Sequence, residues 1–214
     1  MKKIFWWLFL AWSALELTVS AARFQSAGIP ALPSLIDFVF FTLAAAVILF
    51  EAASHVGWRK TWLAFFIVVT VSGAAFRLGA PRLGLACTPT MGLLIADSLP
   101  LALPLLWWSL IGGFYLTYHR VLPIFDARVV ALLVALSALT VGWLLEPFAS
   151  RLKHYWLWEQ GSAPWLYWLG WLVLAFALAR IIPLRGDSKP TGCQKPLTVT
   201  LILAVLFGAG GQML

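Results

Sequence analysis

Apolar residues run through the chain in seven long stretches, separated by breaks that contain polar residues, proline or glycine. Each stretch approaches the roughly 20 residues that an α-helix needs to cross the hydrocarbon core of a membrane. The pattern predicts seven transmembrane helices: residues 4–22, 35–54, 61–78, 98–118, 127–145, 164–182 and 197–213. The expected fold is an all-α polytopic helical bundle, with residues 1–214 forming a single integral membrane domain.

Composition places the chain in the same class. Of its 214 residues, 62% are hydrophobic and only 11% are charged, and the mean hydropathy is strongly positive. Such values are typical of membrane proteins rather than of soluble domains. The net charge of +7 does not indicate nucleic-acid binding, because the basic residues are scattered at the ends of the apolar stretches and form no basic face. The expected surroundings are a lipid bilayer, with no nucleic-acid partner.

The same basic residues predict an orientation. If Lys2 and Lys3 stay in the cytoplasm, ten of the 15 Lys and Arg residues fall on the inner side of the membrane. This bias predicts a cytoplasmic N-terminus, in what we expect to be the inner (plasma) membrane of a bacterium. A cleaved signal peptide over residues 2–22 is the alternative, because a basic start and an apolar run precede small residues at 20–22.

Two long connections fall on one side of the membrane in this orientation, residues 78–97 and 146–164, and could close one site together. Pro100 and Pro104 follow the first of them inside an apolar stretch. They remove backbone donors and bend or delay the helix, which a membrane tolerates only where protein or a cavity surrounds the break. A simple device for starting a helix is the alternative interpretation of these prolines.

Acidic and aromatic residues crowd together between residues 145 and 171. Glu146-Pro147 ends one apolar stretch, and Glu159 follows a run of aromatic residues in the next connection. Charges are costly near hydrocarbon, so carboxyl groups beside a membrane-embedded aromatic cluster are candidates for chemistry or for binding the polar end of an apolar ligand.

Two groups of motifs, taken in order, resemble a known membrane family. Residues 88–108 contain a Thr-Pro turn, a glycine and a Pro-x-x-x-Pro-Leu-x-Trp segment, and residues 146–171 contain Glu-Pro, Trp-x-Trp-Glu, a proline and Gly-Trp. Over roughly residues 76–183 the chain resembles the carotenoid biosynthesis membrane family that includes γ-carotene hydratases and bisanhydrobacterioruberin hydratases. The resemblance implies addition of water across a terminal double bond of a carotenoid or other polyisoprenoid lipid.

The chain also departs from the pattern of this family. An acidic residue expected a few positions before Glu146 is absent, and Gly142 stands in that segment. Cys87 occupies the place of an expected aromatic residue, and Arg77 the place of an expected acid. These departures put the activity in question rather than the family.

Hydration of an isoprenoid double bond needs an acid, surroundings that tolerate a tertiary cation, and a positioned water with a base. A poorly solvated carboxyl group keeps its proton more readily, which suits the acid, and indole faces attract cations. The candidate acid and base are Glu146 and Glu159, with Asp97 third. The candidate substrate-binding residues are Trp107, Trp108, Trp156, Trp158 and Tyr167. The hypothesis needs no metal ion and no organic cofactor.

Each candidate has a structural alternative. Glu146 can face lipid headgroups or pair with Arg151 or Lys153, and Asp97 can cap a helix. Thirteen tryptophans are also expected to form the interfacial belts of any membrane protein. Glu16, inside the first apolar stretch, is either close to the outer interface or an acid of a pocket.

Other polar residues indicate no metal or redox site. Glu51 and His55 share a helix face, but two ligands do not make a metal site. His119 is predicted on the opposite side of the membrane from His154, which excludes a histidine-rich di-iron centre. The two cysteines are likewise predicted on opposite sides, so they are not expected to pair.

Two functions from different classes remain open. One is a carotenoid hydratase, a lyase by reaction type, and the retained Glu146 and Glu159 favour it. The other is a non-catalytic carotenoid- or lipid-binding membrane subunit, which Gly142 favours. Small residues such as Gly112 and Gly113 permit close helix packing, as in an oligomer or an assembly with other carotenoid enzymes.

Overall fold

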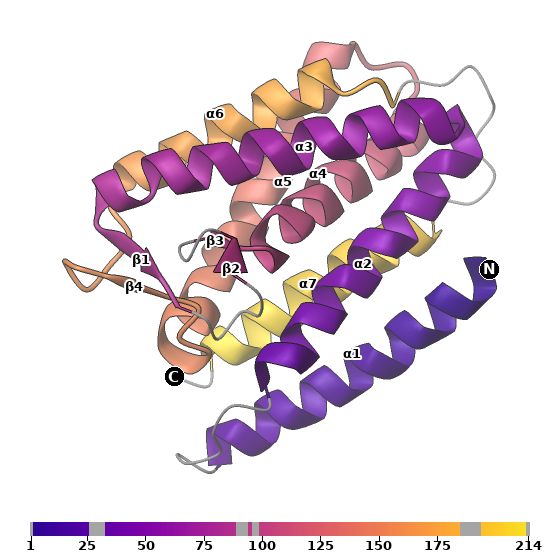
Figure 1. Ribbon diagram of the computed structural model, residues 1–214. Helices are drawn as coiled ribbons and strands as arrows, with labels where there is room; N and C mark the ends of the chain where they lie inside the picture. Colours follow the sequence, from indigo (N-terminus) through magenta and orange to yellow (C-terminus); the bar gives the residue numbers. More distant parts are fainter. Residues whose placement is uncertain (1, 26–32, 89–93, 96–98, 185–193, 213–214) are drawn as a thin grey trace.

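The seven apolar stretches form seven α-helices in the computed structural model, which describes residues 2–25, 33–88, 94–95, 99–184 and 194–212. The helices are α1 (Lys2–Gln25), α2 (Pro33–Val56), α3 (Trp58–Gly79), α4 (Ala102–Val121), α5 (Ala127–Pro147), α6 (Trp165–Ile181) and α7 (Gln194–Gln212). They lie side by side in a bundle, with the N-terminus at one end and the C-terminus at the other (Figure 1). The all-α bundle predicted from the sequence is therefore confirmed.

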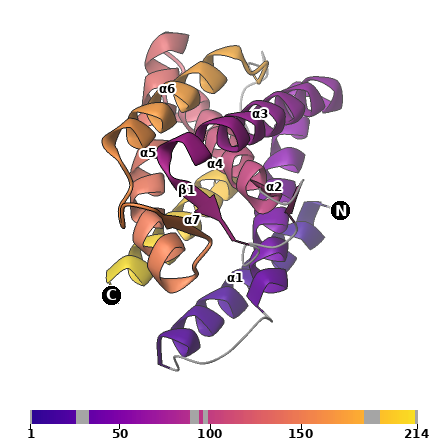
Figure 2. The same ribbon diagram turned by 60° about the vertical axis from the view of Figure 1, so that its left-hand side comes forward.

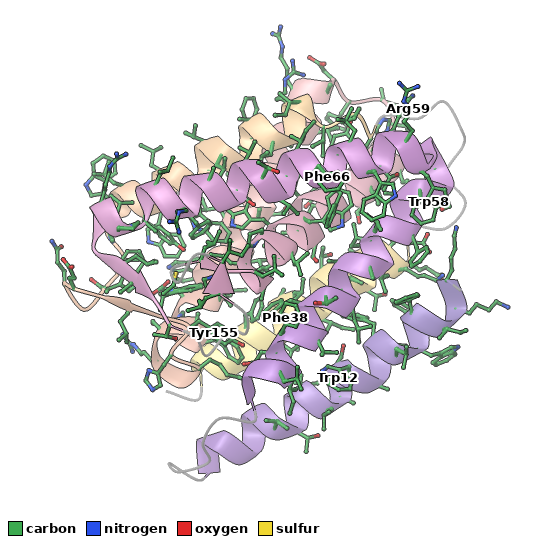
Figure 3. The ribbon with its side chains drawn as sticks, viewed as in Figure 1. Trp12, Phe38, Trp58, Arg59, Phe66 and Tyr155 are labelled. Atoms are coloured by element: carbon green, nitrogen blue, oxygen red, sulfur yellow. The ribbon has the colours of Figure 1, made fainter. Side chains whose placement is uncertain are left out.

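Three segments of the described chain are long and apolar enough to cross a membrane, residues 35–56, 58–79 and 127–151. Two shorter helices, covering 165–181 and 194–208, are also apolar. The outer face of α3 carries exposed aromatic side chains, including Trp58 and Phe66, and Figure 3 shows both of them with Arg59 on this helix. Such a row of rings next to a cation is typical of a surface that meets lipid and its headgroups.

Helix α4 lies at the centre of the bundle and begins later than predicted. The expected start near residue 98 is wrong, because Leu99 and Pro100 form a short strand, β3, paired with β2 (Leu94–Ile95). Pro104 lies in the first turn of α4, where its missing N–H has no helical acceptor in any case. The interpretation of Pro104 as part of a helix start is confirmed.

Close packing around α4 depends on Gly112 and Gly113, the small residues that the sequence analysis associates with close helix packing. A Cβ atom on Gly112 would lie 2.9 Å from Ile48 of α2, and one on Gly113 would lie 2.8 Å from Thr200 of α7. Both contacts lie within one chain. The two glycines therefore let α4 approach its own neighbours α2 and α7.

The two long connections meet at one end of the bundle, as predicted. Strand β1 (Leu85–Cys87) pairs antiparallel with β4 (Trp156–Trp158), with Ala86 opposite Leu157. Thr88 extends the pairing through a bond from its N–H to the Tyr155 carbonyl. Figure 2 brings β1 forward and shows it across the ends of the helices. A short 3-10 turn, Pro81–Leu83, and Gly84 lead the chain from α3 into β1.

A buried ion cluster attaches α1 and α2 to the connection that follows α5. After Pro147 the chain forms one π-helical turn, Phe148–Leu152, and Lys153 comes next. The Lys153 Nζ lies 2.6 Å from Glu16 Oε1 and 2.8 Å from Asp37 Oδ1. The sequence left the role of Glu16 open, and the structure places it in this cluster. Nearby, Trp12 of α1 donates to the Ile36 carbonyl of α2 (Figure 3).

Candidate functional site

Glu146 lies in the last turn of α5 and holds two indole groups. Trp158 Nε1 donates to Glu146 Oε1 at 2.6 Å, and Trp156 Nε1 donates to Oε2 at 3.1 Å. Residues of a strand alternate between its two sides, so Trp156 and Trp158 are both buried while Leu157 between them is exposed. The register of β4 against β1 therefore directs both indoles to the same carboxyl group.

A cavity of about 470 Å³ opens beside Glu146. Its volume falls within the range of about 300–1,000 Å³ that is common for small-molecule sites. Part of the wall is apolar and comes from α5, α6 and α7: Trp143, Leu144, Trp168 and Gly208. Another part is polar and comes from the connection after α5: Ser150, Arg151 and Ser162. The carboxyl group thus stands where an apolar surface meets a polar one.

Glu159 lies on the other side of β4 and is exposed. Its backbone N–H donates to the Gly84 carbonyl at 2.9 Å, and its side chain covers Gly84. It lines a different cavity, of about 310 Å³, together with Arg77 and Cys87. Burial raises the pKa of the Cys87 thiol to about 11. Two acids were predicted to work as a pair, but the structure places Glu146 and Glu159 at separate cavities.

The candidate aromatic residues fall into two groups. Tyr167 meets Trp158 edge to face at 4.8 Å between ring centroids, and Trp107 packs against Trp171 at 4.5 Å. Tyr167 also contacts Trp171, so a continuous series of rings runs from the Glu146 carboxyl group into the core. Trp108 lies elsewhere: its indole N–H donates to the Ala45 carbonyl of α2.

The third acidic candidate, Asp97, lies outside the residues that the structure describes. Glu51, considered with His55 as a pair of metal ligands, accepts a hydrogen bond from Lys195 Nζ at 3.0 Å. Within the described ranges, no group of three His, Cys, Asp or Glu side chains is arranged to hold a metal ion.

Comparison with known proteins gives the family. Residues 36–213 match the family described as carotenoid biosynthesis protein. The chain belongs to this family. The match takes in α3 to α7 and nearly all of α2, whereas α1, with Glu16, precedes it. No curated protein and no solved structure shows significant similarity to the chain.

Gly142 of this carotenoid biosynthesis protein has a packing role that the sequence did not reveal. A Cβ atom at this position would lie 2.9 Å from the Trp171 ring, because α5 and α6 pack closely there. The Trp171 ring is itself held between Trp107 and Phe76. A side chain at residue 142 would have to displace this buried ring.

Sequence reasoning missed several residues at the site. Trp143, Trp168 and Ser150 line the cavity beside Glu146. Ser150 could have been found from its spacing, because it lies four residues after Glu146 and its hydroxyl donates to the Glu146 carbonyl at 2.8 Å. Trp168 carried no local signal that set it apart from the other tryptophans of its segment.

Proposed function

We propose that this carotenoid biosynthesis protein adds water across a terminal isoprenoid double bond of a carotenoid, with Glu146 as the reacting carboxyl group. The observation that supports this most is the position of Glu146 between the apolar and polar walls of one cavity. A polyene end would enter along the apolar wall, and water would reach the same carboxyl group from the polar wall.

One carboxyl group is sufficient for a balanced reaction. The protonated Glu146 gives its proton to the CH carbon of the double bond, and the neighbouring carbon becomes a tertiary cation. A water oxygen then bonds to the cation, and the proton that this water loses returns to the Glu146 carboxylate. The group ends the cycle as it began, so Glu159 is not needed as a separate base.

The two indole N–H groups support this role. Each oxygen of Glu146 accepts one of them, which fixes the plane of the carboxyl group and stabilises the carboxylate that forms when the proton leaves. A carboxylate has about four lone-pair positions, so one on each oxygen remains for the proton or for water.

Charge around the cavity favours a cation at the apolar wall. Trp143 and Trp168 line this wall, and an indole face attracts a cation within about 6 Å. Arg151, at the polar wall, repels a positive charge. We therefore expect the reacting carbon to lie against the tryptophans, with the attacking water on the side of Ser150 and Ser162.

The second candidate function is a non-catalytic carotenoid- or lipid-binding membrane subunit. It is favoured by the separation of Glu159 from Glu146 and by the two hydrogen bonds that Glu146 already accepts, which a purely structural carboxylate would also show. In this function the cavity would hold the pigment without changing it.

Pigment analysis separates the two functions. The chain is expressed in cells that accumulate lycopene or γ-carotene, and the extracted pigments are analysed by mass. Hydration predicts a product heavier by one water, and Glu146→Gln should lower its yield by about 10²–10⁴-fold, the usual contribution of a general acid and base. Glu159→Gln, at comparable protein levels, should leave the yield of the hydrated product unchanged. Unchanged pigment that co-purifies with the protein would instead support the binding subunit.

The proposal includes an orientation. With the N-terminus in the cytoplasm of a bacterial inner membrane, the end of the bundle that carries β1 and β4 faces outward. The ends of helices on the other side, near the α2–α3 and α4–α5 turns, carry Arg59, Lys60, Arg120 and Arg128, which supports this assignment. Reporter fusions after residue 60 and after residue 160 should report opposite sides of the membrane.

A further inference from the structure

A third cavity, of about 150 Å³, lies between α3, α4 and α6. Its lining is almost wholly apolar and contains no charged side chain: Ala75, Phe76, Gly79, Ala80, Leu83, Trp107, Tyr167, Gly170, Trp171 and Leu174. It shares no residue with the cavity beside Glu146.

Three buried polar groups in this lining make no hydrogen bond of good geometry, although the Trp171 indole and the Tyr167 hydroxyl lie close enough to interact with each other. They are the indole N–H groups of Trp107 and Trp171 and the hydroxyl of Tyr167. The three side chains are 0%, 3% and 5% exposed. Their rings contact one another in series, so the three groups are gathered within one small region. Leaving a buried donor unsatisfied costs about 1–3 kcal/mol, and native proteins rarely tolerate several together.

Access to this cavity runs from the side of the bundle. Gly79 of α3 and Gly170 of α6 both line it, and a Cβ atom at either position would meet no atom within 4 Å. Gly170 is exposed. Since α3 is one of the helices long and apolar enough to cross a membrane, we expect the opening, which lies beside the last turn of α3, to be reached from the lipid.

We propose that this cavity binds the oxygen-bearing end of an isoprenoid, with a hydroxyl or keto oxygen accepting hydrogen bonds from the Tyr167 hydroxyl and the Trp107 indole N–H. The apolar lining fits the hydrocarbon part of such a ligand, and two donors match the two lone pairs of one oxygen acceptor, while the Trp171 indole N–H lies close to the Tyr167 hydroxyl. A charged headgroup does not fit, because the lining offers no counter-ion. The site goes beyond the proposed hydration and does not depend on Glu146.

Binding of two polyenes tests this site. The purified full-length chain carries Glu146→Gln, so that pigment is not converted, and is placed in lipid nanodiscs. These are loaded with lycopene or with its derivative that carries one tertiary hydroxyl group at an end. Pigment retained by the captured protein is measured by absorbance. We expect retention of the hydroxylated polyene to exceed that of lycopene, by about 3–10-fold for each hydrogen bond formed.

Two substitutions in the cavity separate a specific site from general adsorption. Tyr167→Phe removes only the hydroxyl and should reduce the preference for the hydroxylated polyene by about 3–10-fold. Gly170→Leu places a side chain at the opening, where a Cβ atom meets no neighbour, and should abolish the preference. Gly208→Leu, which narrows the cavity beside Glu146, is the matched control and should leave the preference unchanged.

Three results would overturn the proposal: equal retention of the two polyenes by the parent chain, an unchanged preference in Tyr167→Phe, or a preference lost in Gly208→Leu and kept in Gly170→Leu. None of these results bears on hydration, which is judged from the mass of the product and from Glu146→Gln in the chain with an intact Tyr167.

Discussion

Lys153 offers the most severe test of the structure, because its charge is wholly buried. The Lys153 side chain is 0% exposed, and its ammonium group is shared by Glu16 and Asp37, whose side chains are 3% and 1% exposed. Lys153→Met keeps a side chain of similar length and apolar character but removes the cation. Two buried carboxyl groups would then lose the cation that they share.

The expected loss is large. Breaking a buried ion pair by removing one partner costs about 3–5 kcal/mol, since the remaining charge is left uncompensated. Here two carboxyl groups lose the same cation, so we expect a loss of at least about 3 kcal/mol, a large part of the roughly 5–15 kcal/mol that holds a typical protein folded. Replacing the whole cluster, as Glu16→Gln, Asp37→Asn and Lys153→Met together, should recover most of the loss, because neutral groups need no counter-ion.

Denaturant titration in detergent, followed by tryptophan fluorescence, measures these differences. Lys195→Met is the matched control: its ion pair with Glu51 is also between helices, but the lysine side chain is 32% exposed. Its loss should cost less than about 1 kcal/mol. The reasoning fails if Lys153→Met is as mild as Lys195→Met, or if the triple variant is less stable than Lys153→Met alone.

Two further predictions concern the residues that differ from the family pattern. Gly142→Ala should lower the free energy of unfolding by about 1–3 kcal/mol, because its methyl group overlaps a buried indole ring. Gly170→Ala adds a methyl group in open space and should not lower the free energy of unfolding. The same denaturant titration measures both variants, and equal effects would contradict the packing argument. In a Cys193→Ser background, maleimide should label Cys87 of the folded chain at pH 8 at about one-hundredth of the rate in denaturant, since its raised pKa keeps the thiol protonated until about pH 11. Labelling that is equally fast in both states would show that the thiolate is not suppressed.

The helices could be predicted because their signal is local. An apolar run of about 20 residues has few alternatives in a membrane, so all seven predicted stretches overlap helices. The one clear error is the start of α4 near residue 98. It arose because Pro100 belongs to a two-residue strand that pairs with β2, and β2 is too short to be recognised as a strand from the sequence. Pairing of this kind depends on partners in space rather than on the pattern along the chain.

The buried charges could not be predicted for the same reason. The sequence offers Lys153 as a possible partner of Glu146, and nothing near it in the sequence shows that its partners lie on the first two helices. Glu146 is singled out in the sequence as an acid close to aromatic residues, and in the structure it accepts hydrogen bonds from two of them. Its hydrogen bonds to Trp156 and Trp158 follow from the pairing of β4 with β1, which sequence reasoning did not foresee.

The short β1–β4 pairing decides which acid faces which cavity. Alternation along β4 sends Trp158 toward Glu146 and leaves Glu159 on the opposite side, so a shift of one residue would exchange the two faces. The register is supported at its edge by Gly84, whose φ of 75° turns the chain from the 3-10 segment into β1. The Gly84 carbonyl accepts the N–H of Glu159 and thereby holds the end of β4. A left-handed glycine far from Glu146 in the sequence thus sets the surroundings of the carboxyl group, which explains why the second acid of the predicted pair lies at another cavity.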